Sequence, residues 1–264
     1  SWISLAEDPQ GRWVIGHENE GLVRITLPKN GKAKLESIKV PVRECRGLVF
    51  AHDSLYAMAN KSHSLFRLRD TNRDNTFDQV EMLKKFSGGT GHGRNQLTLG
   101  PDGKLYAIFG DSVDEPADVK SLPPVVPNPD DIQKTPSGFV ARTDAAGKEW
   151  EIVVRGLRNP YGIDFNAAGD FFTYDADAEY DMGSSWYRPT RVLHLLPGGD
   201  YGWRRVTKRW PPYNPDTASI PQSTLDIGRG SPTSVEFGAG NNFPAPYRNA
   251  LFVLDWSYGR ILAV

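Results

Sequence analysis

GPDGKLYAIFGD, residues Gly100 to Asp111, joins a turn rich in Gly, Pro and Asp to a short apolar run with Tyr, Ile and Phe. Runs of this kind between turn residues are typical of β-strands. Four more stretches repeat the turn-then-strand pattern: DPQGRWVIGH from Asp8, AHDSLYAMAN from Ala51, NAAGDFFTYDAD from Asn166 and FPAPYRNALFVLD from Phe243. With 26 Gly and 20 Pro scattered along the chain, long helices are hard to place. The sequence therefore predicts an all-β protein.

The spacing of these repeats indicates the architecture. They lie roughly 45 to 75 residues apart, which suits four-stranded blades with insertions better than a solenoid of fixed pitch. We expect a β-propeller of the six-bladed type with about five blades represented, residues 1–264 forming a single domain. A propeller closes its ring to remove exposed edges, and the chain stops within the strand-like GRILAV. The domain is therefore expected to be incomplete at the C-terminus.

Composition limits the ligand and partner classes. The 264 residues are 39% hydrophobic, enough for a sizeable core, and the net charge of -1 leaves no footprint for nucleic acid. Cys45 is the only cysteine, which excludes an intrachain disulfide and a CxxCH haem-attachment site. No apolar run reaches the roughly 18 residues of a transmembrane helix, and SWISLAEDPQGRW lacks the pattern of a signal peptide. A small or metal-bound ligand is favoured.

The two largest insertions between the predicted strands are expected to be loops. They are residues 112–137, rich in Pro and Asp, and residues 204–230, which contain WPPYNPD. Loops on one face of a fold often carry its function.

The stretch DTNRDNTFDQVE has the ligand spacing of a calcium loop. Oxygen donors stand at positions 1, 3, 5, 7, 9 and 12, with a backbone carbonyl at position 7, and Asn replaces the usual Gly at position 6. The donors are Asp70, Asn72, Asp74, Thr76, Asp78 and Glu81. The loop lies between two expected strands, so a bound calcium would be structural. The alternative is an Asp- and Asn-rich hairpin that caps its own backbone.

Four segments carry a family resemblance. They are HGRNQLTLGPDGKLYAIFGD from His92, GLRNPYGIDFN from Gly156, LPGGDYGW from Leu196 and SPTSVEFGAGNNFPAPYRNALFV from Ser231. Together they resemble the soluble quinoprotein glucose and sorbosone dehydrogenases, six-bladed propellers that use pyrroloquinoline quinone (PQQ) and calcium. YRPTRV and LDWSYGRI make the chain more similar to large multidomain relatives described as membrane-bound dehydrogenases, which often carry a c-type haem domain.

The resemblance implies roles for particular residues. His92 matches the catalytic base, and imidazole suits removal of a hydroxyl proton. Arg158 and Asn159 match the pair that binds PQQ, and a guanidinium fork suits its carboxylates. Arg260 is the expected further basic cofactor ligand. The substrate would be a sugar or alcohol, the electron acceptor a c-type cytochrome, and the location periplasmic or otherwise extracytoplasmic. For His92, the alternative to a catalytic base is a loop histidine bonded to a backbone carbonyl. For Arg158, the alternative to a cofactor ligand is an arginine paired with an acidic neighbour.

The chain departs from the family pattern at two places. Gly91 precedes His92, where the family commonly has Asp or another polar partner for the imidazole. Cys45 and Arg46 stand where the family has a cofactor-binding Gln before a Gly-Leu pair. The first departure leaves the orientation of the His92 ring open.

A second acidic cluster, DADAEYD, follows the Arg-Asn pair. If this segment is extended, its acidic side chains share one side and repel unless a cation or arginines neutralise them. The family holds its cofactor-bridging calcium near here. We therefore expect calcium ligands among Asp175, Asp177 and Glu179, with Asp181 beside them. Ion pairing with Arg188 and Arg191 is the competing explanation.

Aromatic residues could form a sugar platform, because sugars stack their apolar faces on aromatic rings. The candidates are Trp186, Tyr187, Trp203, Trp210 and Trp256, and we expect at most two of them to contact a sugar. The leading interpretation is a PQQ- and calcium-dependent sugar or alcohol dehydrogenase. The alternatives are a non-catalytic calcium-stabilised propeller that binds carbohydrate or protein, and a calcium-dependent lactonase-type hydrolase, since propellers host unrelated chemistries.

Overall fold

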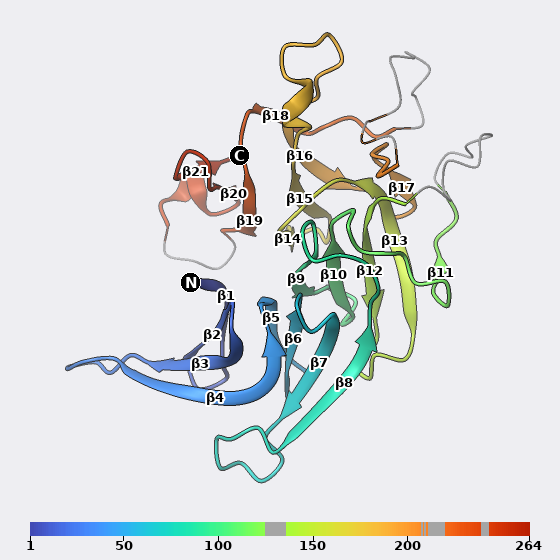
Figure 1. The fold of residues 1–264 in the computed structure, drawn as a ribbon. Coiled ribbons are helices and arrows are strands. Elements are labelled where there is room, and N and C mark those ends of the chain that lie inside the picture. The colour runs from blue at the N-terminus through green and yellow to red at the C-terminus, as the bar shows by residue number, and fades with distance from the viewer. Residues whose placement is uncertain (125–135, 207, 209, 211–219, 239–242) are drawn as a thin grey trace.

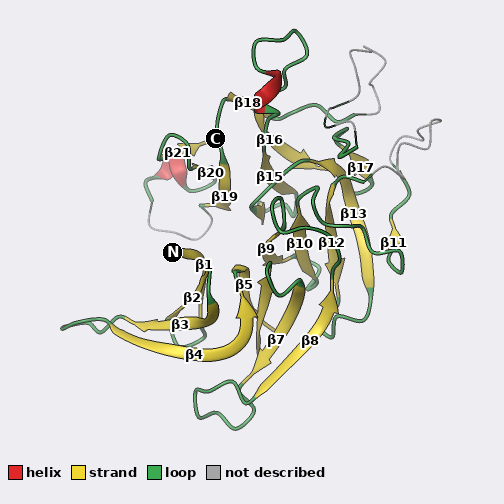
Figure 2. Cartoon of the chain, in the orientation of Figure 1, coloured by secondary structure: helices red, strands yellow, loops and turns green. Residues whose placement is uncertain are grey.

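A computed structural model describes residues 1–124, 136–206, 208, 210, 220–238 and 243–264. In this part of the chain, the strands form five sheets arranged as the blades of a propeller (Figures 1 and 2). The prediction of an all-β propeller with about five blades represented is confirmed. No helix within the described residues is long and apolar enough to span a bilayer.

Neighbouring strands within each blade are mostly antiparallel and follow chain order. The first blade contains β1 (Trp2–Glu7), β2 (Trp13–His17), β3 (Glu20–Thr26) and β4 (Lys34–Arg43). The second contains β5 (Cys45–Ala51), β6 (Ser54–Ala59), β7 (Ser64–Arg69) and β8 (Gln79–Lys85). The third contains β9 (Arg94–Leu99), β10 (Leu105–Phe109), β12 (Gly138–Thr143) and β13 (Trp150–Leu157). Two short strands, β11 (Lys120–Ser121) and β17 (Gly199–Asp200), pair with β13 in parallel.

The last two blades complete the described fold. The fourth contains β14 (Ile163–Phe165), β15 (Phe171–Asp175), β16 (Thr190–Leu195) and β18 (Leu225–Gly228). The fifth contains β19 (Pro232–Phe237), β20 (Leu251–Asp255) and β21 (Arg260–Ala263). Single turns of 3-10 helix lie at η2 (Glu179–Asp181) and η4 (Ala245–Tyr247).

The turn-and-strand stretch of the third blade shows why its apolar run is unbroken. All five residues of β10 are buried. Leu105 and Phe109 pack into the core shared with the second blade, whereas Tyr106 and Ile108 pack into the core shared with the fourth. Because successive strand side chains point to opposite faces, a strand packed on both faces needs apolar residues at every position.

The first strands of the blades place the candidate residues. Strand β5 contacts β1 and β9, and β14 contacts β9 and β19, so these inner strands follow one another around the axis. Arg46 lies at the start of β5, His92 two residues before β9, and Arg158 directly after β13, in the connection to β14. The chain therefore places these three residues at or near the entries to the second, third and fourth blades.

Candidate functional site

His92 and Asp111 form a hydrogen-bonded pair between the segments that flank β9 and β10. The Nδ1 atom of His92 lies 2.7 Å from Oδ1 of Asp111. The second Asp111 oxygen accepts a hydrogen bond of 2.6 Å from the Trp203 indole nitrogen. A neutral imidazole facing a carboxylate carries its proton on Nδ1, which leaves Nε2 as a proton acceptor. Asp111 therefore supplies the orienting partner that Gly91 does not.

The close approach of the two segments depends on Gly110. A Cβ atom at this position would lie 2.7 Å from the carbonyl carbon and oxygen of His92, so a larger residue would displace the loop. The backbone N–H of Asp111 also donates to the carbonyl of Arg158 at 2.8 Å. His92, Asp111 and the Arg158 turn are thus held together by direct contacts.

Asp175 fixes the Arg158–Asn159 turn through hydrogen bonds to its backbone. Its carboxylate accepts the backbone N–H groups of Arg158 at 3.0 Å, Asn159 at 2.8 Å and Ala176 at 2.8 Å. The residue is fully buried. Burial raises its pKa, while the charge of Arg191 and the three N–H groups act in the opposite direction. Asp175 therefore sets the backbone from which the Arg-Asn pair projects.

The Arg158 and Asn159 side chains keep unused hydrogen-bonding capacity. The Nη2 atom of Arg158 pairs with Glu179 at 2.9 Å, and the guanidinium lies 5.4 Å from the Trp203 ring centroid. Its Nε atom and the Oδ1 atom of Asn159 are buried without a hydrogen-bond partner. Buried polar atoms normally have partners, so these two are candidates for contact with a bound ligand.

The acidic cluster that follows is not extended. After Asp175 the chain leaves β15 and enters η2, so its carboxylates do not share one face of a strand. Asp177 accepts a hydrogen bond of 2.5 Å from the Tyr187 hydroxyl, and Glu179 pairs with Arg158. Asp175, Asp177 and Glu179 therefore each have a hydrogen-bond or ion-pair partner in the protein. The partner of Glu179 is Arg158, whereas the competing explanation named Arg188 and Arg191. Calcium binding by this cluster stays a prediction.

Arg260 lies in the fifth blade, at the start of β21. Its Nη2 atom is 2.8 Å from Asp255, and its guanidinium lies 4.7 Å from the Tyr258 ring centroid. No contact described in the structure joins Arg260 to His92 or Arg158. Its role as a cofactor ligand stays a prediction.

The expected calcium loop connects β7 and β8 and projects from the outer part of the second blade (Figure 1). Asp70 accepts the backbone N–H of Asn75 at 2.9 Å, and Asp78 accepts that of Thr71 at 2.7 Å. Glu81 pairs with Arg67 on β7 at 2.6 Å. These bonds match the self-capping hairpin that the sequence also allows.

Among the described residues, no three His, Cys, Asp or Glu side chains are grouped to hold a metal. That finding does not count amide or backbone oxygens, which supply part of the donor set expected for the loop. Calcium binding by Asp70, Asn72, Asp74, Thr76, Asp78 and Glu81 stays a prediction.

The aromatic candidates divide by exposure. Trp203 and Trp210 are buried and pack edge to face, with centroids 4.6 Å apart. Trp186 is 41% exposed and Trp256 is 76% exposed, whereas the Tyr187 hydroxyl is bonded to Asp177. Trp203 and Trp210 therefore pack inside the fold, and Trp203 also donates to Asp111. A sugar platform among the exposed residues stays a prediction. The residues 211–216 of WPPYNPD lie outside the described residues.

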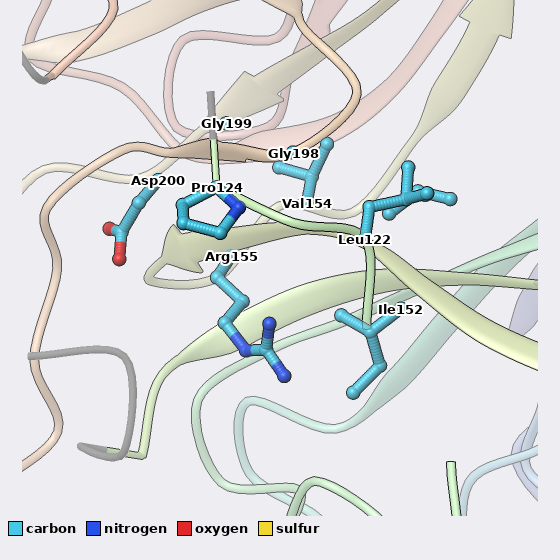
Figure 3. A pocket seen from close by; sticks show the side chains of 9 residues that line it. Leu122, Pro124, Ile152, Val154, Arg155, Gly198, Gly199 and Asp200 are labelled. Atoms are coloured by element: carbon cyan, nitrogen blue, oxygen red, sulfur yellow. The ribbon is translucent and has the colours of Figure 1, made fainter. Parts of the chain in front are cut away.

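A small pocket in the third blade is separate from these residues. It lies where β11 and β17 run along β13, lined by Leu122, Ile152, Arg155 and Asp200 among others (Figure 3). Its volume of about 10 Å³ is room for roughly one water molecule. Arg155 is held there by Glu115 at 2.8 Å. The pocket is too small for a sugar or a quinone.

The sequence predicted roles for His92, Arg158 and Asn159, which stay predictions, and it did not indicate Asp111 or the contacts of Asp175 with the Arg158 turn. The signal for Asp111 was present in the FGD that ends the apolar strand, because a carboxylate directly after a buried strand needs a partner. The sequence alone did not indicate that this partner is His92, 19 residues earlier.

Solved structures share this fold at low sequence identity. The PQQ-bound aldose sugar dehydrogenase from Streptomyces coelicolor is 15% identical, with a TM-score of 0.71 over 100% of this chain and 77% of that one. An oxidoreductase (glucose dehydrogenase) from Thermus thermophilus is 19% identical, with a TM-score of 0.69 over 99% and 78%. The apo soluble aldose sugar dehydrogenase from Escherichia coli is 15% identical, with a TM-score of 0.66 over 99% and 85%.

These matches confirm the quinoprotein sugar dehydrogenase resemblance at the level of the fold. No curated protein matches the sequence. A family model described as Domain of unknown function (DUF7133) matches residues 9–194. The chain therefore belongs to the DUF7133 family.

Proposed function

We propose that this propeller is a PQQ-dependent dehydrogenase that oxidises a hydroxyl group of a sugar or another alcohol to a carbonyl. The observation that carries the proposal is the His92–Asp111 pair, which leaves Nε2 of His92 as a proton acceptor close to the Arg158 turn. The shared fold with PQQ-dependent sugar dehydrogenases supports the same interpretation. A c-type cytochrome as electron acceptor and a periplasmic or other extracytoplasmic location belong to this proposal.

The residues around the Arg158 turn fit PQQ, a planar molecule with carboxylates and quinone oxygens. The buried, unpartnered Nε of Arg158 is a charged donor, and the Asn159 side chain adds an amide with a free oxygen. Arg158 would bind a carboxylate and Asn159 a polar edge of the ring system. When bound, PQQ supplies an electron-accepting quinone.

The protein groups account for the proton in this oxidation. Conversion of a hydroxyl to a carbonyl removes one proton and one hydride from the substrate. His92 takes the proton at Nε2, and Asp111 stabilises the resulting imidazolium through Nδ1. The Trp203 indole holds Asp111 in place and is itself buried, so the carboxylate does not turn away.

The direct test is a titration of chelator-stripped protein with PQQ in calcium buffer, followed by addition of aldoses and alcohols. We expect saturable binding and bleaching of the quinone by at least one sugar. Arg158→Lys should weaken PQQ binding about tenfold or more, because an ammonium cannot make the two-bond contact of a guanidinium. Sugar binding without bleaching would favour a non-catalytic binding propeller, and lactone hydrolysis without redox change a calcium-dependent hydrolase.

Calcium in the Asp70–Glu81 loop is a second part of the proposal. We expect a chelator to lower the Tm of the wild type by about 5 °C or more, because a ligand bound to the native state stabilises it. Asp70→Asn should lower the Tm similarly and remove the response to chelator. A wild-type Tm that is identical with and without chelator would leave the self-capping hairpin as the explanation.

A further inference from the structure

The segment that carries His92 has little intrinsic order. Residues 86–92, FSGGTGH, which we call the base loop, lie between β8 and β9 and contain three glycines. Glycine-rich backbone has high conformational entropy, so a rigid arrangement must come from contacts with its surroundings. Every backbone carbonyl of the base loop accepts a hydrogen bond from another part of the chain.

Arg94 binds the first half of the base loop. Its Nη2 atom donates to the carbonyls of Phe86 at 2.6 Å and Ser87 at 2.8 Å, with a longer contact of 3.5 Å to Gly88. Its Nη1 atom donates to Gly89 at 3.0 Å. Arg94 is fully buried, and burial lowers its pKa to about 10, so it stays charged at neutral pH. A buried cation is expensive, and here carbonyl dipoles of the loop compensate it.

Arg46 and Asn60 bind the second half. Asn60 donates to the Thr90 carbonyl at 2.9 Å, and Arg46 donates to Thr90 at 3.3 Å and to Gly91 at 3.4 Å. The Arg46 guanidinium is itself held by Glu44, at 2.6 Å and 2.9 Å. All three side chains come from the second blade or its entry, so this blade holds the loop against the third.

Ser112 closes the remaining side of the base loop, directly beside Asp111. Its backbone N–H donates to the His92 carbonyl at 3.1 Å, and its hydroxyl accepts the His92 N–H at 3.2 Å. The Gly89 N–H donates to the Ser112 carbonyl at 2.6 Å. The backbone of His92 is therefore fixed relative to the backbone that carries Asp111.

We propose that Arg94 and Arg46 are positioning residues for His92. By binding the carbonyls of the base loop, they keep Nδ1 of His92 on the Asp111 carboxylate and aim Nε2 at the substrate. The effect on turnover rests on the proposed function, whereas the effect on the His92–Asp111 hydrogen bond does not.

The test compares Arg94→Lys and Arg46→Lys with Arg24→Lys. Arg24 is a control matched to Arg94, because it is a buried arginine that donates to a backbone carbonyl, that of Asn75 at 2.7 Å, but it belongs to the first blade. A lysine ammonium is a compact group and cannot span the carbonyls that a guanidinium fork reaches. The readout is the imidazole Nδ1 proton of His92 in histidine-labelled protein by NMR, assigned by its loss in His92→Gln, together with Tm and kcat.

We expect the His92 Nδ1 proton signal to shift upfield or broaden in Arg94→Lys and in Arg46→Lys. In Arg24→Lys the signal should stay unchanged, even if the Tm falls by a similar amount. In an active enzyme, kcat should fall about 10- to 100-fold with KM nearly constant. An unchanged signal in Arg46→Lys would overturn the proposal even if Arg94→Lys does not fold, as would an equal change in Arg24→Lys. A wild type without turnover would refute the proposed function and leave the NMR comparison intact.

Discussion

Replacement of His92 by Gln should lower kcat for sugar oxidation about 10²- to 10⁴-fold, the range that general-base catalysis contributes. Gln can still donate to Asp111, so the local hydrogen bond is kept, but its amide cannot accept and hold the substrate proton. The His92 side chain is 31% exposed, so Tm should change little. Dye-linked turnover of the PQQ-loaded protein, measured with Tm, gives both quantities.

Two companion variants make this result specific. Asp111→Asn should also lower kcat, because an amide can present an N–H to Nδ1 and move the imidazole proton to Nε2. His194→Gln is the control, since His194 also faces a carboxylate, Asp170 at 3.6 Å, but lies in the fourth blade on β16. Turnover that survives in His92→Gln, or that falls equally in His194→Gln, would contradict the assignment of His92 as the base.

Replacement of Asp175 by Ala should lower the free energy of unfolding by about 3–5 kcal/mol, the largest stability effect expected for this site. The change leaves Arg191, itself 4% exposed, without its facing carboxylate. It also removes the acceptor of three backbone N–H groups, including those of Arg158 and Asn159. Urea unfolding measures the loss, and PQQ affinity should fall with it because the Arg-Asn turn is released.

The matched control for this prediction is Asp170→Ala. Asp170 is half exposed and faces His194, so its removal should change stability by less than about 1 kcal/mol. Adding Arg191→Met to Asp175→Ala should restore part of the lost stability, because the uncompensated buried charge is then gone. If Asp175→Ala is no less stable than Asp170→Ala, Asp175 does not anchor the turn.

The fold could be predicted largely from local features of the sequence. The turn before Leu105 is built as the residues suggest, with Gly103 at a positive φ of 74° and the Asp102 carboxylate accepting the Lys104 N–H. Such turns fix where strands begin, and runs like that of β10 fix which strands are covered on both sides. These properties depend on neighbouring residues, so they can be read from short stretches.

The site could be predicted only in part, because its partners meet through tertiary contacts. Arg158 and His92 were found from motifs, but the pairing of His92 with Asp111 depends on how closely the ends of β9 and β10 approach. Asp175 was predicted as a calcium ligand from its acidic neighbours. That role stays a prediction. The structure shows that its oxygens accept N–H groups of the turn before β14, a contact decided by where β15 ends and not by the spacing of charges.

The double-sided packing of β10 has a consequence for biosynthesis. Its odd and even residues belong to cores completed by different sheets, including Leu193 and Leu195 of β16. When a nascent chain has emerged from the ribosome only as far as the third blade, one face of β10 is still open to solvent. The sheet is fully buried only after β16 has also emerged. The His92–Asp111 pair, which flanks β9 and β10, should accordingly form late in synthesis, when stalled or truncated chains would still expose this strand to chaperones.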